Sequence, residues 1–236
     1  MKIAIIIPTL NERESLPLLF DEFKQVHNKI TNKCLGVEIV IVDDNSSDGT
    51  QNFVKECLNN SKFKIKLIER KERGLATAVI RGFNETDADL LCVMDADLSH
   101  TPSILPTMIE NSKSFDIVLP CRNMPGGGAE KWPIHRKLTS MLATSLVRFL
   151  GIQSRDPMGG FFLIHRSVIE GVKLSPIGYK ILLEILVKGK YKNFIEVPYM
   201  FRNRSVGRSK MNGKIIGQYL KHLWRLKKWQ KRKTGV

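Results

Sequence analysis

The sequence predicts an α/β fold, with a mostly parallel sheet that carries helices on both faces. Apolar, strand-like runs and helix-like segments alternate four times in the first half of the chain, a pattern typical of βαβ units. Three of these runs end in acidic or asparagine-rich loops. Because the carboxyl ends of parallel strands lie along one edge of a sheet, where such folds bind ligands, these loops predict a site.

The first four strands follow from short apolar runs that are bounded by polar or turn residues. They are expected at residues 2–8, 37–42, 63–69 and 90–95. The third run is amphipathic and is therefore expected near an edge of the sheet. Asn11, with Glu14 three residues later, is expected to cap the first helix, and Ser47 or Asp48 the second. A further helix is expected at residues 74–84.

The second half of the chain continues the alternation. Strands are expected at residues 117–120, directly after residues 156–162, and at 193–198, with helices at residues 133–150 and 179–188. Three consecutive glycines restrain the backbone little, so the loop at residues 124–128 is a candidate lid. Glu184 lies among apolar residues, and we expect it either to face the site or to pair with an arginine.

Two aspartates one residue apart, Asp95 and Asp97, follow the fourth strand. Two carboxylates this close repel each other unless a cation or hydrogen-bond donors lie nearby. Mg²⁺ and Mn²⁺ take carboxylate and phosphate oxygens as ligands, so the pair predicts a metal site at which the bound cation also binds a diphosphate. The alternative is a polar strand end that leads into the next helix. Glu12 and Asp44 also follow parallel strands and are expected to line the same edge.

The overall composition narrows the classes of partner. A net charge of +15 predicts an anionic partner, such as nucleic acid, nucleotide phosphates or an anionic membrane surface. Neither a P-loop nor a dinucleotide-binding glycine motif is present, and no aromatic-basic strand favours nucleic acid. The four cysteines lack C-x-x-C spacing, which predicts reduced thiols and no zinc site. We expect neither a signal peptide nor a membrane-spanning helix.

Two basic segments end the chain. The loop at residues 201–210 carries Arg204 and Lys210 on either side of Gly207, and it could close over a diphosphate or be a solvated loop. From residue 211 onward the sequence predicts one helix with an apolar face and a basic face. This pattern suits a helix that lies in an anionic membrane interface. Docking on a partner helix is the second interpretation, and nucleic-acid binding is the third.

Four motifs together resemble one enzyme family. IPTLNERESLP, IVIVDDNSSDGT, RGLATAVIRGF and MDADLSH are similar to glycosyltransferase family 2, which has a GT-A, Rossmann-like fold. DADLSH, the arginine after the fifth strand (Arg122) and the R-x-x-G-x-S-K pattern from Arg204 favour the dolichyl- and polyprenyl-phosphate mannosyltransferase branch. The resemblance implies a catalytic domain at residues 1–210 and a basic amphipathic helix at residues 211–236.

The resemblance also implies roles for individual residues. Those that would hold the nucleoside are Pro8, Leu10, Glu12, Val42 and Asp44. Those that would hold the metal and the sugar diphosphate are Asp95, Ala96 and Asp97, with Asp95 and Asp97 as metal ligands. Those that would contact phosphates and, with Asp97, support catalysis are Arg122, Arg204 and Lys210. Those near the acceptor phosphate would be Arg136 and Ser140. Some members carry Gln where this chain has Ser99, which leaves a third protein ligand open.

The implied activity is an inverting transfer of mannose from GDP-mannose to a dolichyl or polyprenyl phosphate, dependent on Mg²⁺ or Mn²⁺, in protein glycosylation. A lipid phosphate is already an anion near pH 7, so a cation-rich site without an obvious base suits this reaction. The alternatives are UDP-glucose or UDP-N-acetylglucosamine as donor, a non-lipid acceptor, or an inactive membrane-recruiting subunit. The expected location is cytoplasmic, peripheral on the cytosolic face of a membrane, held by the basic tail, a membrane-anchoring subunit, or both.

Overall fold

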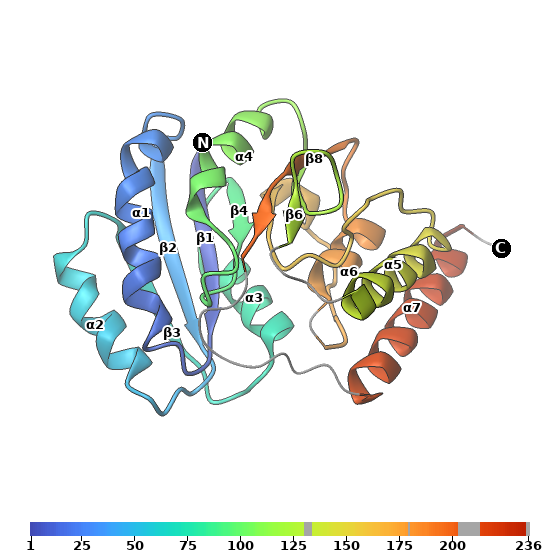
Figure 1. Cartoon of the computed structure of the whole chain (residues 1–236), viewed down its shortest axis with the longest axis horizontal. Helices are drawn as coiled ribbons and strands as arrows, with labels where there is room; N and C mark the ends of the chain where they lie inside the picture. Colours follow the sequence, from blue (N-terminus) through green and yellow to red (C-terminus); the bar gives the residue numbers. More distant parts are fainter. Residues whose placement is uncertain (130–133, 179, 203–212, 235–236) are drawn as a thin grey trace.

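The computed structural model describes residues 1–129, 134–178, 180–202 and 213–234, without the side chains of residues 59–60, 134–140, 213–216 and 234. A seven-stranded sheet has helices on both sides (Figure 1). In spatial order its strands are β3 (Lys64–Glu69), β2 (Gly36–Asp43), β1 (Lys2–Thr9), β4 (Leu90–Val93), β7 (Phe162–His165), β5 (Ile117–Cys121) and β8 (Phe194–Pro198). Only β7 runs antiparallel to its neighbours among these strands. The predicted mostly parallel α/β fold is confirmed, and β3 lies at an edge as expected.

The helices fill the segments between the strands. They are α1 (Ser15–Thr31), α2 (Thr50–Asn60), α3 (Leu75–Asn84), α4 (Leu105–Asn111), α5 (Ile134–Arg148), α6 (Ile181–Lys188) and α7 (Gly213–Thr234), with short 3₁₀ turns η1 (Pro102–Ile104) and η2 (Arg166–Val168). The loop expected to be a lid ends in a second, small sheet of β6 (Gly128–Ala129) and β9 (Met200–Phe201). The pairing of β6 with β9 therefore holds the end of this loop beside the segment after β8. The glycines of the loop still permit its backbone to move.

One predicted helix cap is wrong. Asn11 has a positive φ of 59°, and its Oδ1 accepts a hydrogen bond from the Ser47 N–H at 2.9 Å, so it joins the β1 and β2 loops. Helix α1 begins at Ser15 after Glu14, whose side chain forms no capping bond. The second cap is closer to expectation, because Asp48 Oδ1 accepts the N–H of the first α2 residue at 3.0 Å.

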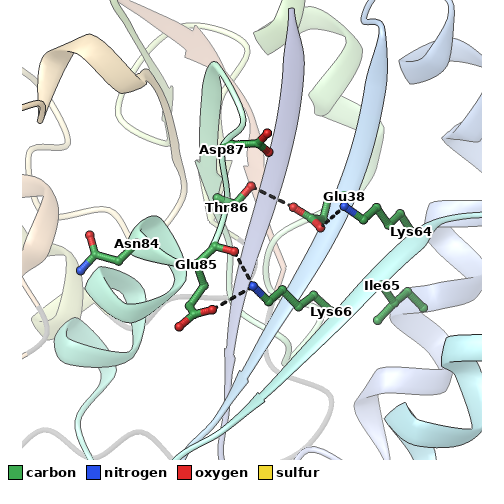
Figure 2. A pocket seen from close by; sticks show the side chains of 8 residues that line it. All are labelled: Glu38, Lys64, Ile65, Lys66, Asn84, Glu85, Thr86 and Asp87. Atoms are coloured by element: carbon green, nitrogen blue, oxygen red, sulfur yellow. Dashed lines mark hydrogen bonds and ion pairs between the residues drawn. The ribbon is translucent and has the colours of Figure 1, made fainter.

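A hollow lies at the amino-terminal edge of β2 and β3 and extends to the loop between α3 and β4 (Figure 2). Its charged groups pair with one another: Glu38 Oε1 is 2.9 Å from Lys64 Nζ, and Lys66 Nζ is 2.8 Å from Glu85 Oε2. Thr86 Oγ1 also donates to Glu38 at 2.8 Å. Since ligands of this fold class bind at the opposite edge, this hollow is not the candidate site.

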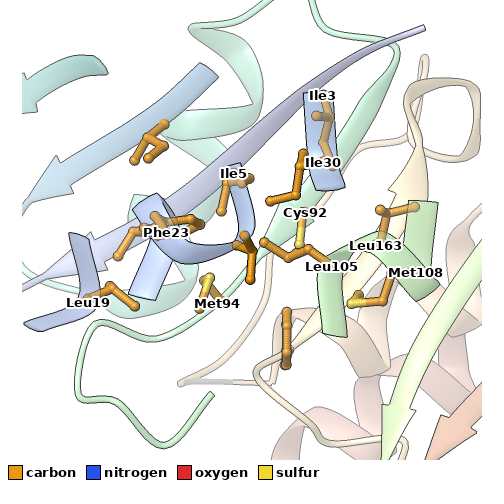
Figure 3. Close-up of a cluster of buried hydrophobic side chains, with 14 of the residues drawn as sticks. Ile3, Ile5, Leu19, Phe23, Ile30, Cys92, Met94, Leu105, Met108 and Leu163 are labelled. Carbon is orange, nitrogen blue, oxygen red and sulfur yellow. The ribbon is translucent and has the colours of Figure 1, made fainter. Parts of the chain in front are cut away.

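The alternation of side chains along β1 separates two hydrophobic cores. Ile3, Ile5 and Ile7 face a core that includes α1 and α4, part of which Figure 3 shows. Ala4 and Ile6 face the other core, which includes α3, α6 and α7. Burial of each large aliphatic side chain contributes roughly 1.5–3 kcal/mol. The sheet is therefore fixed from both sides, and its carboxyl edge is a rigid platform for the loops.

Helix α7 packs on the domain instead of standing apart from it. Tyr219 and Leu226 are buried in the second core, and Tyr219 Oη donates to the Ala143 carbonyl of α5 at 2.5 Å. Further along, Lys227 Nζ donates to the Phe149 carbonyl at 3.1 Å. Part of the apolar face that we expected at a membrane is therefore a core face. In the portion of the chain that the structure describes, no helix is both long and apolar enough to cross a membrane.

Glu184 of α6 is fully buried, and both expectations for it are wrong. Its Oε1 accepts hydrogen bonds from Lys188 Nζ and from the Ser175 N–H, the latter at 2.9 Å. Its Oε2 lies 3.7 Å from Nε2 of His222 on α7. This carboxylate therefore pairs with a lysine and a histidine that the sequence pattern did not connect to it.

Candidate active site

The carboxyl ends of four parallel strands bring the predicted site residues of β1, β2, β4 and β5 and of the loops after them to one edge of the sheet. β1 ends at Thr9 beside Asp43 of β2, and the chain after β4 leads directly to Asp95. Arg122 follows the last residue of β5. Loops from neighbouring strands meet there, which is the geometry that the acidic strand ends predicted.

Two adjacent aspartates, the last residue of β2 and the residue that follows it, have different partners. Asp43 is fully buried, and its carboxylate accepts hydrogen bonds from the Thr9 hydroxyl, the Ser46 hydroxyl and the Gln51 amide, at 2.9, 2.5 and 2.6 Å. It thereby fixes the shape of the loop. Because these bonds occupy Asp43, Asp44 is the member of the pair that could bind a ligand.

Asp44 is held from the β3–α3 loop. Its Oδ2 accepts the Gly74 N–H at 2.7 Å, and its Oδ1 lies 3.0 Å from Arg70 Nη1. Oδ1 forms no aligned hydrogen bond within the described part of the chain, although it is buried. Arg70 Nη2 in turn donates to Thr77 Oγ1 at 2.8 Å. The carboxylate is thus oriented while one oxygen retains acceptor capacity.

The other residues predicted to hold a nucleoside lie next to Asp44. Pro8 of β1 pairs in register with Val42 of β2, which is fully buried. Leu10 follows the end of β1 and is partly buried. Glu12 is partly buried, and its N–H donates to Thr50 Oγ1 at 2.9 Å. Val42 is therefore a buried residue of the sheet, whereas Pro8, Leu10 and Glu12 lie at the end of β1 and on the loop that follows it.

The loop after β4 has an unusual backbone. Leu98 has a φ of 64°, a left-handed conformation that is rare for a bulky residue and that occurs most often at functional sites. Asp97 Oδ1 accepts hydrogen bonds from the Ser99 N–H and hydroxyl at 3.0 and 2.5 Å. The Asp95 N–H donates to Nδ1 of His100 at 2.9 Å. These bonds close the loop, hold the Asp97 carboxylate and fix the backbone at Asp95.

His100 is buried and has a defined tautomer. Because Nδ1 accepts the Asp95 N–H, the ring proton is on Nε2. The ring stacks on Phe161 with centroids 4.9 Å apart, and the edges of Tyr199 and Phe201 surround it. Burial lowers the pKa of His100, so the imidazole is neutral at pH 7. It supports the backbone of Asp95 without adding charge.

The donor set fits a hard divalent cation that is shared with a substrate. Gly160 lies beside the Asp95 carboxylate, because a Cβ at this position would be 3.4 Å from each of the two carboxylate oxygens. A glycine at this position therefore leaves space next to the Asp95 carboxylate. Ala96, between the two aspartates, is buried in the first core. No group of three acidic, histidine or cysteine side chains suited to a metal exists within the described ranges. Two carboxylates with phosphate oxygens as further ligands match the preference of Mg²⁺ and Mn²⁺.

Arg122 forms a two-point ion pair with Asp156. Its Nε and Nη2 donate to the two oxygens of Asp156 at 2.6 and 2.7 Å, and its guanidinium lies 5.2 Å from the Phe201 ring centroid. Burial is the largest single influence and lowers the pKa of Arg122, but the hydrogen bonds to Asp156 and the attraction of its charge together raise this pKa above its ordinary value. Arg122 is therefore charged and precisely oriented, while Asp156 balances its charge.

Lys180, the residue before α6, is a further cation at this edge. It is partly buried, and its charge interacts with those of Arg122, Asp156 and Asp95. Burial, and then repulsion from Arg122, lower its pKa. The structure therefore adds a lysine to the aspartates and arginine that the sequence predicted.

Four predicted residues cannot be placed in this arrangement. Arg204 and Lys210 lie outside the described residues. Arg136 and Ser140 lie on the first turns of α5, but their side chains are outside the described part. The roles of these four remain predictions.

Four residues of the site escaped the sequence analysis: Arg70, His100, Asp156 and Lys180. His100 ends the quoted motif MDADLSH, and Asp156 precedes Pro157 and two glycines, so each had a local signal. Arg70 and Lys180 had none, because only the topology brings them to Asp44 and Asp95.

Comparison with known proteins finds relatives that cover nearly the whole chain. The Glycosyl transferase family 2 pattern matches residues 4–172. A dolichol-phosphate mannosyltransferase of Pyrococcus furiosus is 47% identical over 235 residues, 98% of this chain and 65% of that protein. One of Saccharomyces cerevisiae is 36% identical, covering 93% and 85% of the two chains. An undecaprenyl-phosphate mannosyltransferase of Micrococcus luteus is 31% identical, covering 92% and 90%. The chain thus spans slightly less than two thirds of the length of the Pyrococcus furiosus relative.

Among solved structures, glucosyl-3-phosphoglycerate synthase of Mycobacterium tuberculosis, in complex with Mn²⁺, UDP and glucosyl-3-phosphoglycerate, has a similar fold. The TM-score is 0.65 at 14% identity, covering 93% of this chain and 76% of that one. A complex of the same enzyme with Mg²⁺ and UDP also has a TM-score of 0.65. At this identity the likeness concerns the fold, and it confirms the predicted architecture.

Proposed function

Because this chain belongs to glycosyl transferase family 2, we propose that it transfers mannose from GDP-mannose to a dolichyl or polyprenyl phosphate. The names of the relatives support this acceptor and this sugar. The observation that carries the proposal is the meeting of Asp95 and Asp97 with Arg122 at one sheet edge. Paired carboxylates with a neighbouring arginine suit a reaction in which a diphosphate leaves and a phosphate attacks.

On the donor side, Pro8, Leu10, Glu12, Val42 and Asp44 would hold the nucleoside. The buried Oδ1 of Asp44 retains acceptor capacity, which suits a ring N–H, an amino group or a ribose hydroxyl. Guanine and uracil both offer such donors, so UDP-glucose or UDP-N-acetylglucosamine is the alternative donor within the same mechanism.

Asp95 and Asp97 would hold Mg²⁺ or Mn²⁺ together with the donor diphosphate, beside the backbone of Ala96. When bound, the cation supplies Lewis-acid stabilisation of the leaving group. Asp97 is kept in place by Ser99, and Asp95 by His100. Arg122, with Arg204 and Lys210 of the basic loop, would compensate the negative charge of the phosphates.

On the acceptor side, a lipid phosphate is ionised near pH 7, so its attack on C1 of the sugar needs charge compensation more than a general base. Attack in line with the departing diphosphate would invert C1 and give a β-linked lipid phosphosugar from an α-linked donor. Arg136 and Ser140 on α5 would lie near the acceptor phosphate. A non-lipid acceptor is the alternative.

A surface on α5 and α7 suits a peripheral position on an anionic membrane. The interface patch consists of exposed apolar residues on both helices and of the residue that follows α5: Met141, Leu142, Leu146, Leu220 and Trp224 on the helices, and Phe149 after α5. Lys227 and Lys228 lie 4.8 and 5.1 Å from the ring centroids of Phe149 and Trp224, respectively. Amphipathic surfaces with aromatic and lysine side chains favour anionic bilayers. We therefore propose that the protein lies on the cytosolic face of a membrane, held there by this surface, by a membrane-anchoring subunit, or by both.

The test is transfer of mannose into a lipid fraction by the full chain, with Asp97→Asn as the matched variant. Asn keeps the shape but removes the charge that a divalent cation needs. We expect a loss of transfer of at least about 100-fold with an unchanged melting temperature. Equal transfer by both proteins would contradict the proposed role of Asp97 as a metal ligand.

A further inference from the structure

Glu196 of β8 lies beside the segment that leads to Asp156. Its Oε1 accepts hydrogen bonds from the Ser154 hydroxyl at 2.8 Å and from the Arg155 N–H at 2.6 Å. Its Oε2 is 3.9 Å from Arg155 Nε. The Glu196 side chain is only 12% exposed and Ser154 is buried, so the bond between them is largely shielded from water, which strengthens it. One carboxylate oxygen therefore holds two consecutive residues of this segment.

The Ser154 hydroxyl extends this hold to Asp156. While Ser154 Oγ donates to Glu196, it accepts the Asp156 N–H at 3.2 Å. From the other side, Asn123 Nδ2 donates to the Arg155 carbonyl at 3.1 Å. Residues 154–156 are therefore bonded both to β8 and to the loop after β5, and these bonds fix the backbone from which the Asp156 side chain extends.

The position of Asp156 decides the orientation of Arg122. The two hydrogen bonds between them, at 2.6 and 2.7 Å, require the carboxylate and the guanidinium to be aligned with each other. The Phe201 ring covers the guanidinium with its centroid 5.2 Å away. Glu196 comes from the strand next to β5, where Leu119 is its partner in register. A series of direct contacts thus connects Glu196 to the arginine that follows β5.

We propose that Glu196 is a positioning residue of the active site, which places Asp156 by holding residues 154–156 and thereby orients Arg122 toward a phosphate of the substrates. The inference rests on the proposed function, because that function assigns a phosphate to Arg122. The phosphate could be the donor diphosphate or the acceptor phosphate, which offer the same chemistry. An arginine that is oriented before the substrate binds needs little reorganisation afterwards, and this strengthens its electrostatic contribution.

The first test compares Glu196→Ala with Glu196→Gln. Both bonds to the segment end on Oε1, and a glutamine oxygen can accept both, whereas alanine accepts neither. Binding of GDP with Mn²⁺ reports the donor arm, and binding of farnesyl phosphate reports the acceptor arm. We expect Glu196→Ala to weaken at least one of them about tenfold, and Glu196→Gln to stay within about threefold of the wild type. Wild-type binding of both probes by Glu196→Ala, or equal losses in the two variants, would overturn the proposal.

Glu38→Ala is the matched control for these variants. Glu38 is also a strand residue with a side chain that is 13% exposed, and it accepts the Thr86 hydroxyl at 2.8 Å and pairs with Lys64. It lies at the opposite edge of the sheet, in the hollow of Figure 2. We expect Glu38→Ala to lower the melting temperature about as much as Glu196→Ala and to bind both probes like the wild type. A comparable loss of binding in Glu38→Ala would overturn the positioning role, because general destabilisation would then explain the effect.

The second test asks whether Glu196 acts through the pair of Asp156 and Arg122. In a protein with Arg122→Met and Asp156→Leu the pair is absent, so adding Glu196→Ala should weaken binding of the probe no further. Independent, multiplying losses would overturn the proposal. If Glu196→Ala does not fold, Ser154→Ala takes its place in both tests, because it removes the hydroxyl between Glu196 and the Asp156 N–H.

These binding measurements separate the inference from the proposed function. If wild-type protein transfers no mannose but Glu196→Ala still loses phosphate binding, the inference holds and the assigned sugar or acceptor is wrong. If transfer occurs and Glu196→Ala binds both probes and turns over like the wild type, the proposed function holds and the inference is wrong.

Discussion

Replacement of Asp156 by alanine removes the partner of Arg122 and should destabilise the protein strongly. The pair has two charge-assisted hydrogen bonds at 2.6 and 2.7 Å, and the two side chains are 14% and 4% exposed. Hydrogen bonds to charged groups contribute about 1.5–3 kcal/mol each, and breaking a buried pair costs about 3–5 kcal/mol. Because the Phe201 ring still covers the guanidinium, we expect a value near the lower end, about 3 kcal/mol.

Chemical denaturation and thermal melting would measure this loss. For a chain of this size, about 3 kcal/mol corresponds to a decrease in melting temperature of roughly 6–12 °C. Asp21→Ala is the control, since Asp21 and Lys24 form a pair that is more than 60% exposed at both ends, and such pairs contribute about 1 kcal/mol or less.

A double variant tests whether the cost comes from an arginine that has lost its ion pair with Asp156. Arg122→Met combined with Asp156→Leu removes both charges, so it should be more stable than Asp156→Ala alone. If Asp156→Ala loses no more stability than Asp21→Ala, the ion pair is not the strong interaction that its geometry indicates, and our reasoning about Arg122 is refuted.

Two further predictions concern α5 and α7. Phe149→Ser and Trp224→Ser should each weaken binding to anionic vesicles about tenfold. Leu35→Ser, which replaces an 89% exposed leucine between α1 and β2, should leave this binding unchanged. Equal binding by all three variants would contradict the proposal that the interface patch binds the membrane. Burial lowers the pKa of His222 below 6.5, although the charge of Glu184 opposes this shift. As the pH falls, His222 therefore binds a proton in the unfolded chain before it does so in the folded chain. The free energy of unfolding should therefore have its full value above pH 6.5 and decrease as the pH falls below 6.5. In melting experiments over a pH series, His222→Phe should show a smaller decrease than the wild type. An equal decrease in both proteins would contradict this reasoning.

The sequence was sufficient for most of the sheet. Continuous apolar runs predicted β1, β2 and β4 within one or two residues, because buried parallel strands leave little freedom in composition. The placement of β7 between β4 and β5, antiparallel to both, could not be read from its local pattern. Pairing partners far apart in the chain depend on the whole topology.

The site was predictable where its residues are neighbours in sequence. Asp95 and Asp97 lie on one strand end, so a local motif identified them. Asn11 was misread as a helix cap because its backbone is left-handed and its side chain bonds across to the β2 loop. Glu184 was expected either to face the site or to pair with an arginine, but in the fold it lies beside a lysine of its own helix and a histidine of α7.

Transfer of labelled mannose from GDP-mannose into a polyprenyl phosphate, with and without Mg²⁺ or Mn²⁺, tests the proposed function most directly. UDP-glucose would be assayed in parallel. We predict metal-dependent label in the lipid fraction from GDP-mannose and none from UDP-glucose. Label from UDP-glucose alone would retain the mechanism and contradict the donor. Wild-type protein that labels no lipid from either donor would contradict the proposed reaction.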